Sequence, residues 1–230
     1  MVSAFYASSF LAILSLSITF WSAILLYVTP TKHVPLTLLN ASTDARNIER
    51  ILIETNFTQR GIYLPPKNLI NIESSLIFIP KATPTPLPKP EETNERLQSP
   101  KKDGLFLTPP GFSLSLLFEQ ELGEAFINLD LPHLCHLLPK LLIEGLGIAE
   151  NAEFQEQGNK VTMQITNSIF NTACRETRKL TRTHEQIGCL LPSAIACVLA
   201  KATGKPIVIA NEGRSKGDKT TTIEYQIMEE

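Results

Sequence analysis

The sequence predicts an α+β protein: one transmembrane helix at the N-terminus, then a soluble domain in which antiparallel hairpins pack against helices. Three observations lead to this fold class. Residues 1–31 contain no Asp, Glu, Lys or Arg. Both helical and alternating apolar patterns occur later in the chain. The expected strands come in adjacent pairs, which favours an antiparallel sheet over a repeated strand–helix–strand unit.

The overall composition narrows the function classes. The chain has 230 residues, of which 43% are hydrophobic and 19% are charged, so most of it is not disordered. Lys and Arg number 21 against 23 Asp and Glu, which gives a net charge of -2. This balance argues against nucleic acid as a partner bound through bulk charge. Four cysteines are too few for a disulfide-stapled scaffold.

The N-terminal segment, residues 1–31, is predicted to be a retained membrane anchor. Its apolar run over residues 4–28 exceeds the about 20 residues that a helix needs to cross a bilayer core. A cleaved signal peptide is the alternative, but no basic residue precedes the run and Leu26-Tyr27-Val28-Thr29 is a poor cleavage site. No other stretch looks long and apolar enough, so we expect a single-pass protein.

Residues 32–80 are predicted to form a small juxtamembrane module, and residues 81–103 a linker. The module would contain a helix over 41–57 and two extended segments, 61–66 and 75–80, each closed by proline. The linker carries five prolines among charged and hydroxyl side chains, which is typical of a semi-rigid spacer. A ligand for a proline-recognising domain is the alternative interpretation of this segment.

Residues 104–230 are predicted to form the main α+β domain, able to fold without the rest of the chain. Leucines at i, i+4, i+7 and i+8 indicate a helix near 131–144. Val161, Met163 and Ile165 alternate with polar residues, as in a half-buried strand. The other expected elements are helices near 114–122, 171–186 and 192–203, and strands near 152–157, 207–209 and 220–228.

Cys189 is a candidate reactive thiol. It lies three residues before Pro192, near the predicted N-terminus of a helix, where a thiol can have a lowered pKa and act as a nucleophile. The alternative is a small buried hydrophobic residue. His133, Cys135 and His136 would not converge on a helix, so no metal is predicted. The sequence contains no phosphate-binding loop and no Gly-x-Ser-x-Gly elbow, and no cofactor is predicted.

Four basic residues in the predicted helix over 171–186 are a candidate contact for membrane lipid or a partner. Arg175, Arg178, Lys179 and Arg182 fall at i, i+3, i+4 and i+7, which places them on one helix face. On a membrane-tethered domain this basic stripe could meet anionic headgroups or an acidic partner. A solvated helix face is the alternative.

The C-terminal half resembles a known family over about residues 112–228. The features are found at 142–148 (LIEGLGI), 165–168 (ITNS), 188–189 (GC), 193–196 (SAIA) and 202–206 (ATGKP). Together they resemble the 4-vinyl-reductase-type domain, whose fold is shared with the Bet-type subunits of the TRAPP tethering complexes. The whole chain, with its Tyr63-Leu64-Pro65-Pro66 segment, also resembles a group of archaeal membrane proteins.

The resemblance implies an α+β domain that dimerises readily and, in several members, holds a small or lipidic molecule in an apolar cavity. Such domains usually sense, bind or scaffold. Some members end with further cysteines that bind metal, whereas residues 205–230 contain neither cysteine nor histidine. We therefore expect a membrane-anchored, non-catalytic protein that senses a small apolar molecule or lipid, or scaffolds as a homodimer through its C-terminal domain. An enzyme using Cys189 as nucleophile is the alternative.

The expected orientation places everything after the anchor in the cytoplasm. Lys32, Arg46 and Arg50 follow the anchor and no basic side chain precedes it, as the positive-inside rule requires. Four cysteines without an evident framework also fit a reducing compartment. Two glycosylation sequons, which begin at Asn40 and Asn56, point the other way. With the opposite topology the protein would be an extracellular binding module.

Overall fold

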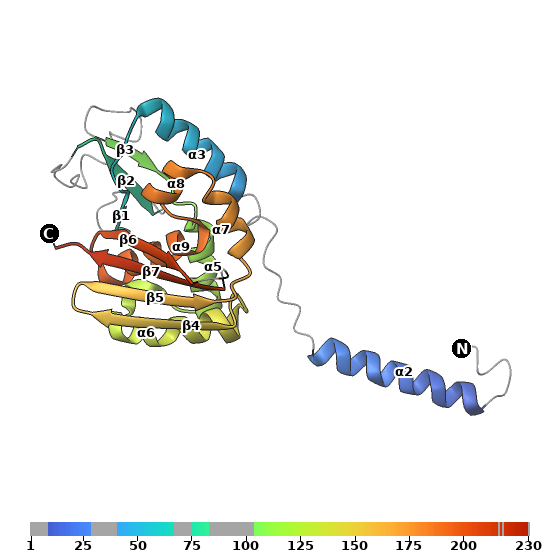
Figure 1. The fold of residues 1–230 in the computed structure, drawn as a ribbon. Helices are drawn as coiled ribbons and strands as arrows, with labels where there is room; N and C mark the ends of the chain where they lie inside the picture. The colour runs from blue at the N-terminus through green and yellow to red at the C-terminus, as the bar shows by residue number, and fades with distance from the viewer. Residues whose placement is uncertain are drawn as a thin grey trace. The chain divides into compact units, whose positions relative to one another are not determined.

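The chain divides into two compact units, Met1–Val34 and Pro35–Glu230. The first contains helix α2 (Ser9–Val28), and the second contains a sheet with its helices (Figure 1). The predicted linker at 81–103 lies, apart from its first two residues, outside the described part of the chain. The computed structural model describes residues 9–28, 41–66, 75–82, 104–215, 217 and 219–229.

Helix α2 is an uncharged, predominantly apolar helix. It is 20 residues long and has no acidic residue in its first turn and no basic residue in its last. At about 1.5 Å per residue it is about 30 Å long, which equals the thickness of a bilayer hydrocarbon core. The hydroxyls of Ser15, Ser17 and Thr19 donate to carbonyls one turn earlier, so these polar groups are satisfied within the helix.

The second unit is built on one seven-stranded sheet with the strand order β3-β2-β1-β6-β7-β5-β4. Every pairing in it is antiparallel, which confirms the predicted antiparallel hairpins and the mixed α and β composition. The strands are β1 (Ile62–Leu64), β2 (Leu76–Pro80), β3 (Gly104–Leu107), β4 (Asn151–Gln157), β5 (Lys160–Thr166), β6 (Ile207–Arg214) and β7 (Thr220–Ile227).

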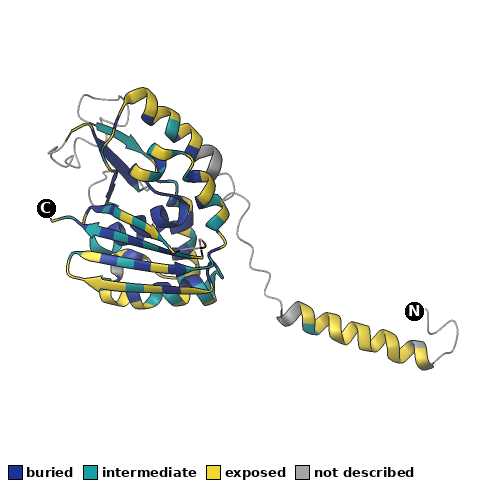
Figure 2. Cartoon of the chain, viewed as in Figure 1, coloured by how far each residue is buried: buried dark blue, intermediate teal, exposed yellow. Residues whose placement is uncertain are grey.

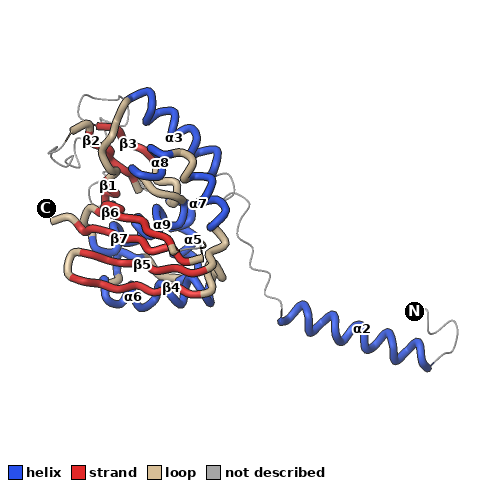
Figure 3. The backbone as a smooth tube through the Cα atoms, viewed as in Figure 1, coloured by secondary structure: helices blue, strands red, loops and turns tan. Residues whose placement is uncertain are grey.

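Helices cover one face of this sheet and one of its corners (Figure 3). In the view of Figure 1, helices α5, α6 and α9 lie behind the strands. Helices α3, α7 and α8 contact one another and lie beside one end of strand β6. The helices are α3 (Ala41–Thr55), α5 (Phe112–Leu122), α6 (Leu131–Lys140), α7 (Asn171–Thr177), α8 (Thr181–Gln186) and α9 (Leu190–Thr203). A π-helical turn, Leu141–Gly145, continues α6, and a 3-10 turn, Phe126–Asn128, follows α5.

The two segments predicted as a module at 32–80 and a domain at 104–230 share this sheet. Strand β1 pairs with β2 on one side and with β6 on the other, with Ile62 opposite Phe78 and Val208. The predicted boundary therefore does not separate two compact units, because the strands of the first segment extend the sheet of the second. If residues 104–230 folded alone, as expected, strand β6 would lose its partner β1 and expose that edge to solvent. An exposed edge is unfavourable for an apolar strand.

The strand pattern explains why one face of the sheet is buried. On β5, Val161, Met163 and Ile165 are buried, as predicted, whereas Thr162 is half-buried and Gln164 is exposed. Buried residues alternate with more exposed ones along β5 and β7 (Figure 2), whereas β1 and β2 are buried throughout. This alternation is typical of an antiparallel sheet with helices on one face and solvent on the other.

A bulge in β6 changes which of its side chains point toward the helices. The pairing with β7 shifts between Ile209 and Asn211, so Ala210 is an extra residue on the β6 side. Ile209 lies opposite the buried Tyr225, and Glu212 lies opposite the buried Ile223. The bulge therefore places Glu212 on the same, helix-covered face as Ile209, which an unbroken alternation would not do.

Helix α9 forms the centre of the core. Its residues from Leu190 to Ala200 are all buried. A Cβ on Gly111, at the start of α5, would lie 2.0 Å from the backbone nitrogen of Ala194, so glycine and alanine allow these helices to touch. The hydroxyl of the buried Tyr63 donates to the Ile187 carbonyl at 2.6 Å, and that of Tyr225 to the Pro192 carbonyl at 3.2 Å. These bonds attach strands β1 and β7 to the beginning of α9.

Composition alone would mistake this core for a membrane span. Within the described residues, Thr181–Thr203 is a helical segment long and apolar enough to cross a bilayer, whereas the apolar helix Ala12–Leu25 within α2 is too short by the same measure. However, 83% of the most apolar window of Thr181–Thr203 is buried inside the domain. The expectation that no other stretch has span-like composition was therefore wrong, and burial identifies this segment as a core element.

The predicted helix over 171–186 is two short helices in the structure. Helix α7 ends at Thr177 and α8 begins at Thr181, with Leu180 between them at φ -95 and ψ 82, outside the helical region. The carboxylate of Glu49 on α3 accepts hydrogen bonds from the backbone N–H groups of Arg182 and Thr183, at 3.3 and 2.7 Å. A carboxylate at this place satisfies the first N–H groups of a new helix and so stabilises the break.

Candidate functional site

The break between α7 and α8 disperses the predicted basic stripe. Lys179 forms an exposed ion pair with Glu176 at 2.7 Å, three residues earlier on the chain. Arg182 points back to α3, where its guanidinium donates to the Leu52 carbonyl at 3.0 Å and to Asn56 Oδ1 at 3.3 Å. Arg175 is exposed and Arg178 is half-buried. The four residues therefore do not form one continuous basic face, because they do not lie on one helix.

Cys189 is not a free thiol in the structure. It forms a disulfide with Cys174 of α7, with 5.4 Å between their Cα atoms. Both residues are buried, and the disulfide ties α7 to the residue immediately before α9. The prediction of a reactive thiol at Cys189 is corrected accordingly. The enzyme hypothesis that used this thiol as nucleophile loses the residue on which it rested.

A polar cluster lies where α8 covers the bulged end of β6. His184 Nδ1 is 3.8 Å from Glu212 Oε2, and Glu212 Oε1 is 3.5 Å from Arg214 Nε. All three side chains are mostly buried, with 17%, 10% and 10% of their surfaces exposed. His184 and Glu212 line an open cavity of about 340 Å³, together with Thr58, Arg60, Glu185, Gln186, Ile209 and Asn211.

The environment of His184 disfavours the charged form of its imidazole. Burial lowers the pKa of His184, and the positive charges of Arg178 and Arg214 lower it further. Glu212 and Glu185 oppose this effect and raise the pKa, but they do not outweigh it. A neutral imidazole at the edge of a cavity donates one hydrogen bond through one ring nitrogen and accepts one through the other.

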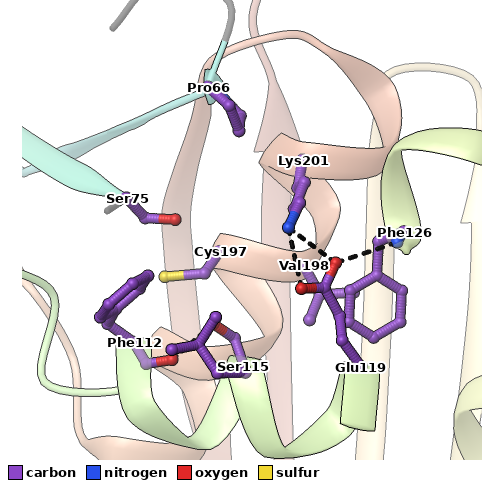
Figure 4. Close-up of a pocket in the computed structure, with 10 residues that line it drawn as sticks. Pro66, Ser75, Phe112, Ser115, Glu119, Phe126, Cys197, Val198 and Lys201 are labelled. Carbon is purple, nitrogen blue, oxygen red and sulfur yellow. Dashed lines mark hydrogen bonds and ion pairs between the residues drawn. The ribbon is translucent and has the colours of Figure 1, made fainter. Parts of the chain in front are cut away.

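A second pocket lies between α5 and α9 and is mostly apolar (Figure 4). It has a volume of about 270 Å³. Figure 4 shows the thiol of Cys197 pointing into it between Phe112 and Ser75. The lining residues are Pro66, Ser75, Phe112, Ser115, Leu116, Glu119, Phe126, Cys197, Val198 and Lys201.

One ion pair provides the charge on the wall of this pocket. Lys201 Nζ lies 2.7 Å from Glu119 Oε1 and 2.8 Å from Oε2, and the Phe126 N–H donates to Oε1 at 3.0 Å. Both side chains retain some exposure, 28% for Lys201 and 16% for Glu119. The Glu119 carboxylate is thus fixed from two sides, while the ammonium of Lys201 has three N–H donors for two carboxylate oxygens.

The two cysteines outside the disulfide are poor nucleophiles. Cys135 and Cys197 are both buried. Burial raises the pKa of Cys197 to about 12 and that of Cys135 to about 11, and the negative charge of Glu156 contributes at Cys135. Because the thiolate is the reactive form, neither residue is suited to nucleophilic chemistry at neutral pH.

No metal centre is formed by the described residues. Within the part of the chain that the structure describes, no group of three or more His, Cys, Asp or Glu is placed to hold an ion. On α6, Cys135 is buried while His133 and His136 are exposed. Cys135 therefore lies on the core side of α6, away from solvent, and the expectation that no metal binds stays a prediction.

Sequence reasoning missed both pockets. No motif marks the residues that carry the polar groups, which are His184, Glu212, Glu119 and Lys201. The first two lie 28 positions apart in the sequence. Glu212 sits two residues before Arg214, a spacing that places two charges on one strand face, but such pairs usually face solvent. The sequence signal that could have indicated the polar cluster is that Glu212 and Arg214 follow the β-branched, apolar start of the same strand.

Comparison with protein-family models gives a match over residues 6–226 to a family described as a domain of unknown function, DUF7982. The chain belongs to the DUF7982 family. The match covers both units, so the helix α2 and the sheet domain are matched together as DUF7982. No curated protein and no solved structure matches the chain. The resemblance to the 4-vinyl-reductase-type domain is not tested by these comparisons and stays a prediction.

Proposed function

We propose that this DUF7982 protein is a membrane-anchored, non-catalytic binding protein whose sheet domain holds a small, largely apolar molecule between α5 and α9. The observation that carries the proposal is the pocket of about 270 Å³ with one ion pair on an otherwise mainly apolar wall. Ligand sites combine apolar walls with a few placed polar groups in this way, and drug-sized ligands occupy about 300–1,000 Å³. The ligand is therefore small.

The chemistry of the wall defines the ligand class. Phe112, Leu116 and Val198 offer apolar contact, while the third N–H donor of Lys201 is available for an acceptor atom. The negative charge of Glu119 offsets the ammonium, so a full negative charge on the ligand is not required. The fitting molecule has an apolar body and one hydrogen-bond acceptor, such as an alcohol, a carbonyl or a single carboxylate.

The membrane attachment is assigned to α2. Its 20 residues match the bilayer core in length, and its described apolar side chains are exposed, with Phe10 at 73% and Leu16 at 76%. In water such a surface would be strongly unfavourable, whereas in lipid it needs no protein partner. The basic stripe is not included in this assignment, because Arg182 is bound to α3.

A homodimer through the sheet domain stays a prediction. Small residues on a helix permit close packing against a sheet or a second copy, and α9 carries four alanines: Ala194, Ala196, Ala200 and the half-buried Ala202. The first three are buried against the chain's own sheet and α5. A second copy would therefore have to use another surface.

Native mass spectrometry of the full chain tests the binding proposal. The full chain is purified in two detergents of different mass, so that adducts that change with the detergent can be set aside. We expect one retained small molecule, common to both preparations. A chain that carries none in either preparation would contradict the proposal.

Two variants on α5 test whether the molecule occupies this pocket. Leu116 lines the pocket and is 38% exposed, so Leu116→Trp can fill the cavity without entering the core. Gln120 is exposed on the same helix and does not line the pocket, so Gln120→Trp is the matched control. The retained mass should disappear in the first variant and persist in the second. Retention of the molecule in both variants would show that it binds at another site.

A further inference from the structure

The end of α3 presents a glycosylation sequon in an accessible form. Asn56, Phe57 and Thr58 follow the last residue of the helix. Asn56 has a φ of 53, a left-handed conformation that ends helices. Asn56 and Thr58 are exposed, whereas Phe57 between them is buried. The two residues that define the sequon therefore face solvent, and the middle one anchors the segment.

The amide of Asn56 is oriented by a partner. Its Oδ1 accepts a hydrogen bond from Arg182 at 3.3 Å. Glycosylation modifies the other arm of the amide, Nδ2, and leaves the carbonyl oxygen as an acceptor. A sugar on Nδ2 is therefore compatible with the contact that joins α3 to α8.

The disulfide is an independent observation on the compartment. Cys174 and Cys189 lie on either side of α8 and are joined in the folded domain. Structural disulfides persist in oxidising surroundings outside the cytoplasm and are rare inside it. Cysteines without a pairing framework fit a reducing compartment, whereas the Cys174–Cys189 disulfide favours an oxidising one.

We propose that Asn56 is a site of N-linked glycosylation and that the sheet domain faces the outside of the membrane. In this reaction a bond forms between Nδ2 and the anomeric carbon of an oligosaccharide carried on a lipid phosphate or pyrophosphate. The bond from that carbon to the phosphate oxygen breaks, the lipid phosphate leaves, and the amide loses one proton. The inference stands apart from the proposed ligand pocket, because neither Asn56 nor the disulfide lines it.

The opposite orientation was predicted from three basic residues after the anchor, Lys32, Arg46 and Arg50. The last two lie in α3, within the folded unit that contains the disulfide. Arg46 lies 18 residues and Arg50 22 residues past the end of α2, at and beyond the limit of about 15–20 residues within which basic residues bias orientation. Lys32 and the first sequon residue, Asn40, lie outside the described residues.

The test is glycopeptide mass spectrometry of the full chain, made in a host whose membranes carry an N-glycosylation pathway. The wild type and Thr58→Ser should carry a glycan on Asn56, because serine preserves the sequon. Thr58→Ala and Asn56→Gln should lose it. Asn47→Gln, at an exposed asparagine of α3 outside any sequon, should keep it. An unmodified Asn56 in the wild type overturns the site, and a glycan on Asn40 alone overturns the site but keeps the orientation.

Thiol counting checks the compartment separately. Intact cells are quenched in acid, and the denatured chain is alkylated before and after reduction. Two thiols, Cys135 and Cys197, should react before reduction, and four cysteines after it. Four reactive thiols before reduction would overturn the proposed orientation. A missing ligand in the native spectra would leave both of these results unchanged, so the two proposals fail separately.

Discussion

Breaking the Cys174–Cys189 disulfide should destabilise the sheet domain by about 3 kcal/mol. The two cysteines are 15 residues apart, and closing a loop of this length in the unfolded chain accounts for about 3 kcal/mol in the chain-entropy description. For a domain of this size, 1 kcal/mol corresponds to about 2–4 °C in melting temperature, so reduction should lower it by about 6–12 °C. The effect arises because the reduced unfolded chain gains conformations, whereas the folded contacts change little.

The assay compares the wild type with Cys174→Ala/Cys189→Ala, each with and without reductant. The full chain is unfolded in a mild detergent and followed by near-ultraviolet circular dichroism, which reports on the fully buried Tyr63 and Tyr225. Reductant should destabilise the wild type and leave the double variant unchanged, because only the wild type has the bond to lose. Equal stability of oxidised and reduced wild type would refute the reasoning, and so would a reductant effect of the same size in the double variant.

Three further changes test the contacts described above, each by chemical or thermal unfolding of the full chain. Glu49→Ala removes the carboxylate that caps α8 and should cost about 2 kcal/mol, whereas Glu54→Ala, exposed on the same helix, should have almost no effect. Equal losses would show that the cap is unimportant. The lowered pKa of His184 means that the unfolded chain binds the proton more tightly, so stability should fall as the pH decreases below about 6.5. His184→Gln should flatten the plot of stability against pH in that range. An unchanged slope would mean that other groups cause the pH dependence. Gly111→Ala places a Cβ 2.0 Å from a backbone nitrogen of α9 and should lower the free energy of unfolding by about 3 kcal/mol. Gly213→Ala, whose Cβ would have its nearest neighbour at 4.0 Å, should be close to neutral. Similar losses in the two variants would contradict the close approach of α5 and α9.

The elements with a strong local pattern could be predicted from the sequence. The alternation of Val161, Met163 and Ile165 gave the strand β5 with its buried face, because side chains alternate strictly across a strand. Helix α9 ends where Gly204 adopts a φ of 62, a conformation that glycine adopts without steric cost. The uncharged run at the N-terminus likewise predicted helix α2, since most of its residues favour apolar surroundings and none is charged.

Only the tertiary structure decided the features that depend on contacts between distant parts of the chain. The break between α7 and α8 is stabilised by Glu49, more than 130 residues away in sequence, so the helical periodicity of 171–186 could not reveal it. That break brings Cys174 next to Cys189 and turns Arg182 away from the predicted stripe. A local pattern reports the preference of one segment for helix, strand or burial. Which segments meet depends on the packing free energy summed over the whole fold, and no short stretch of sequence contains that sum.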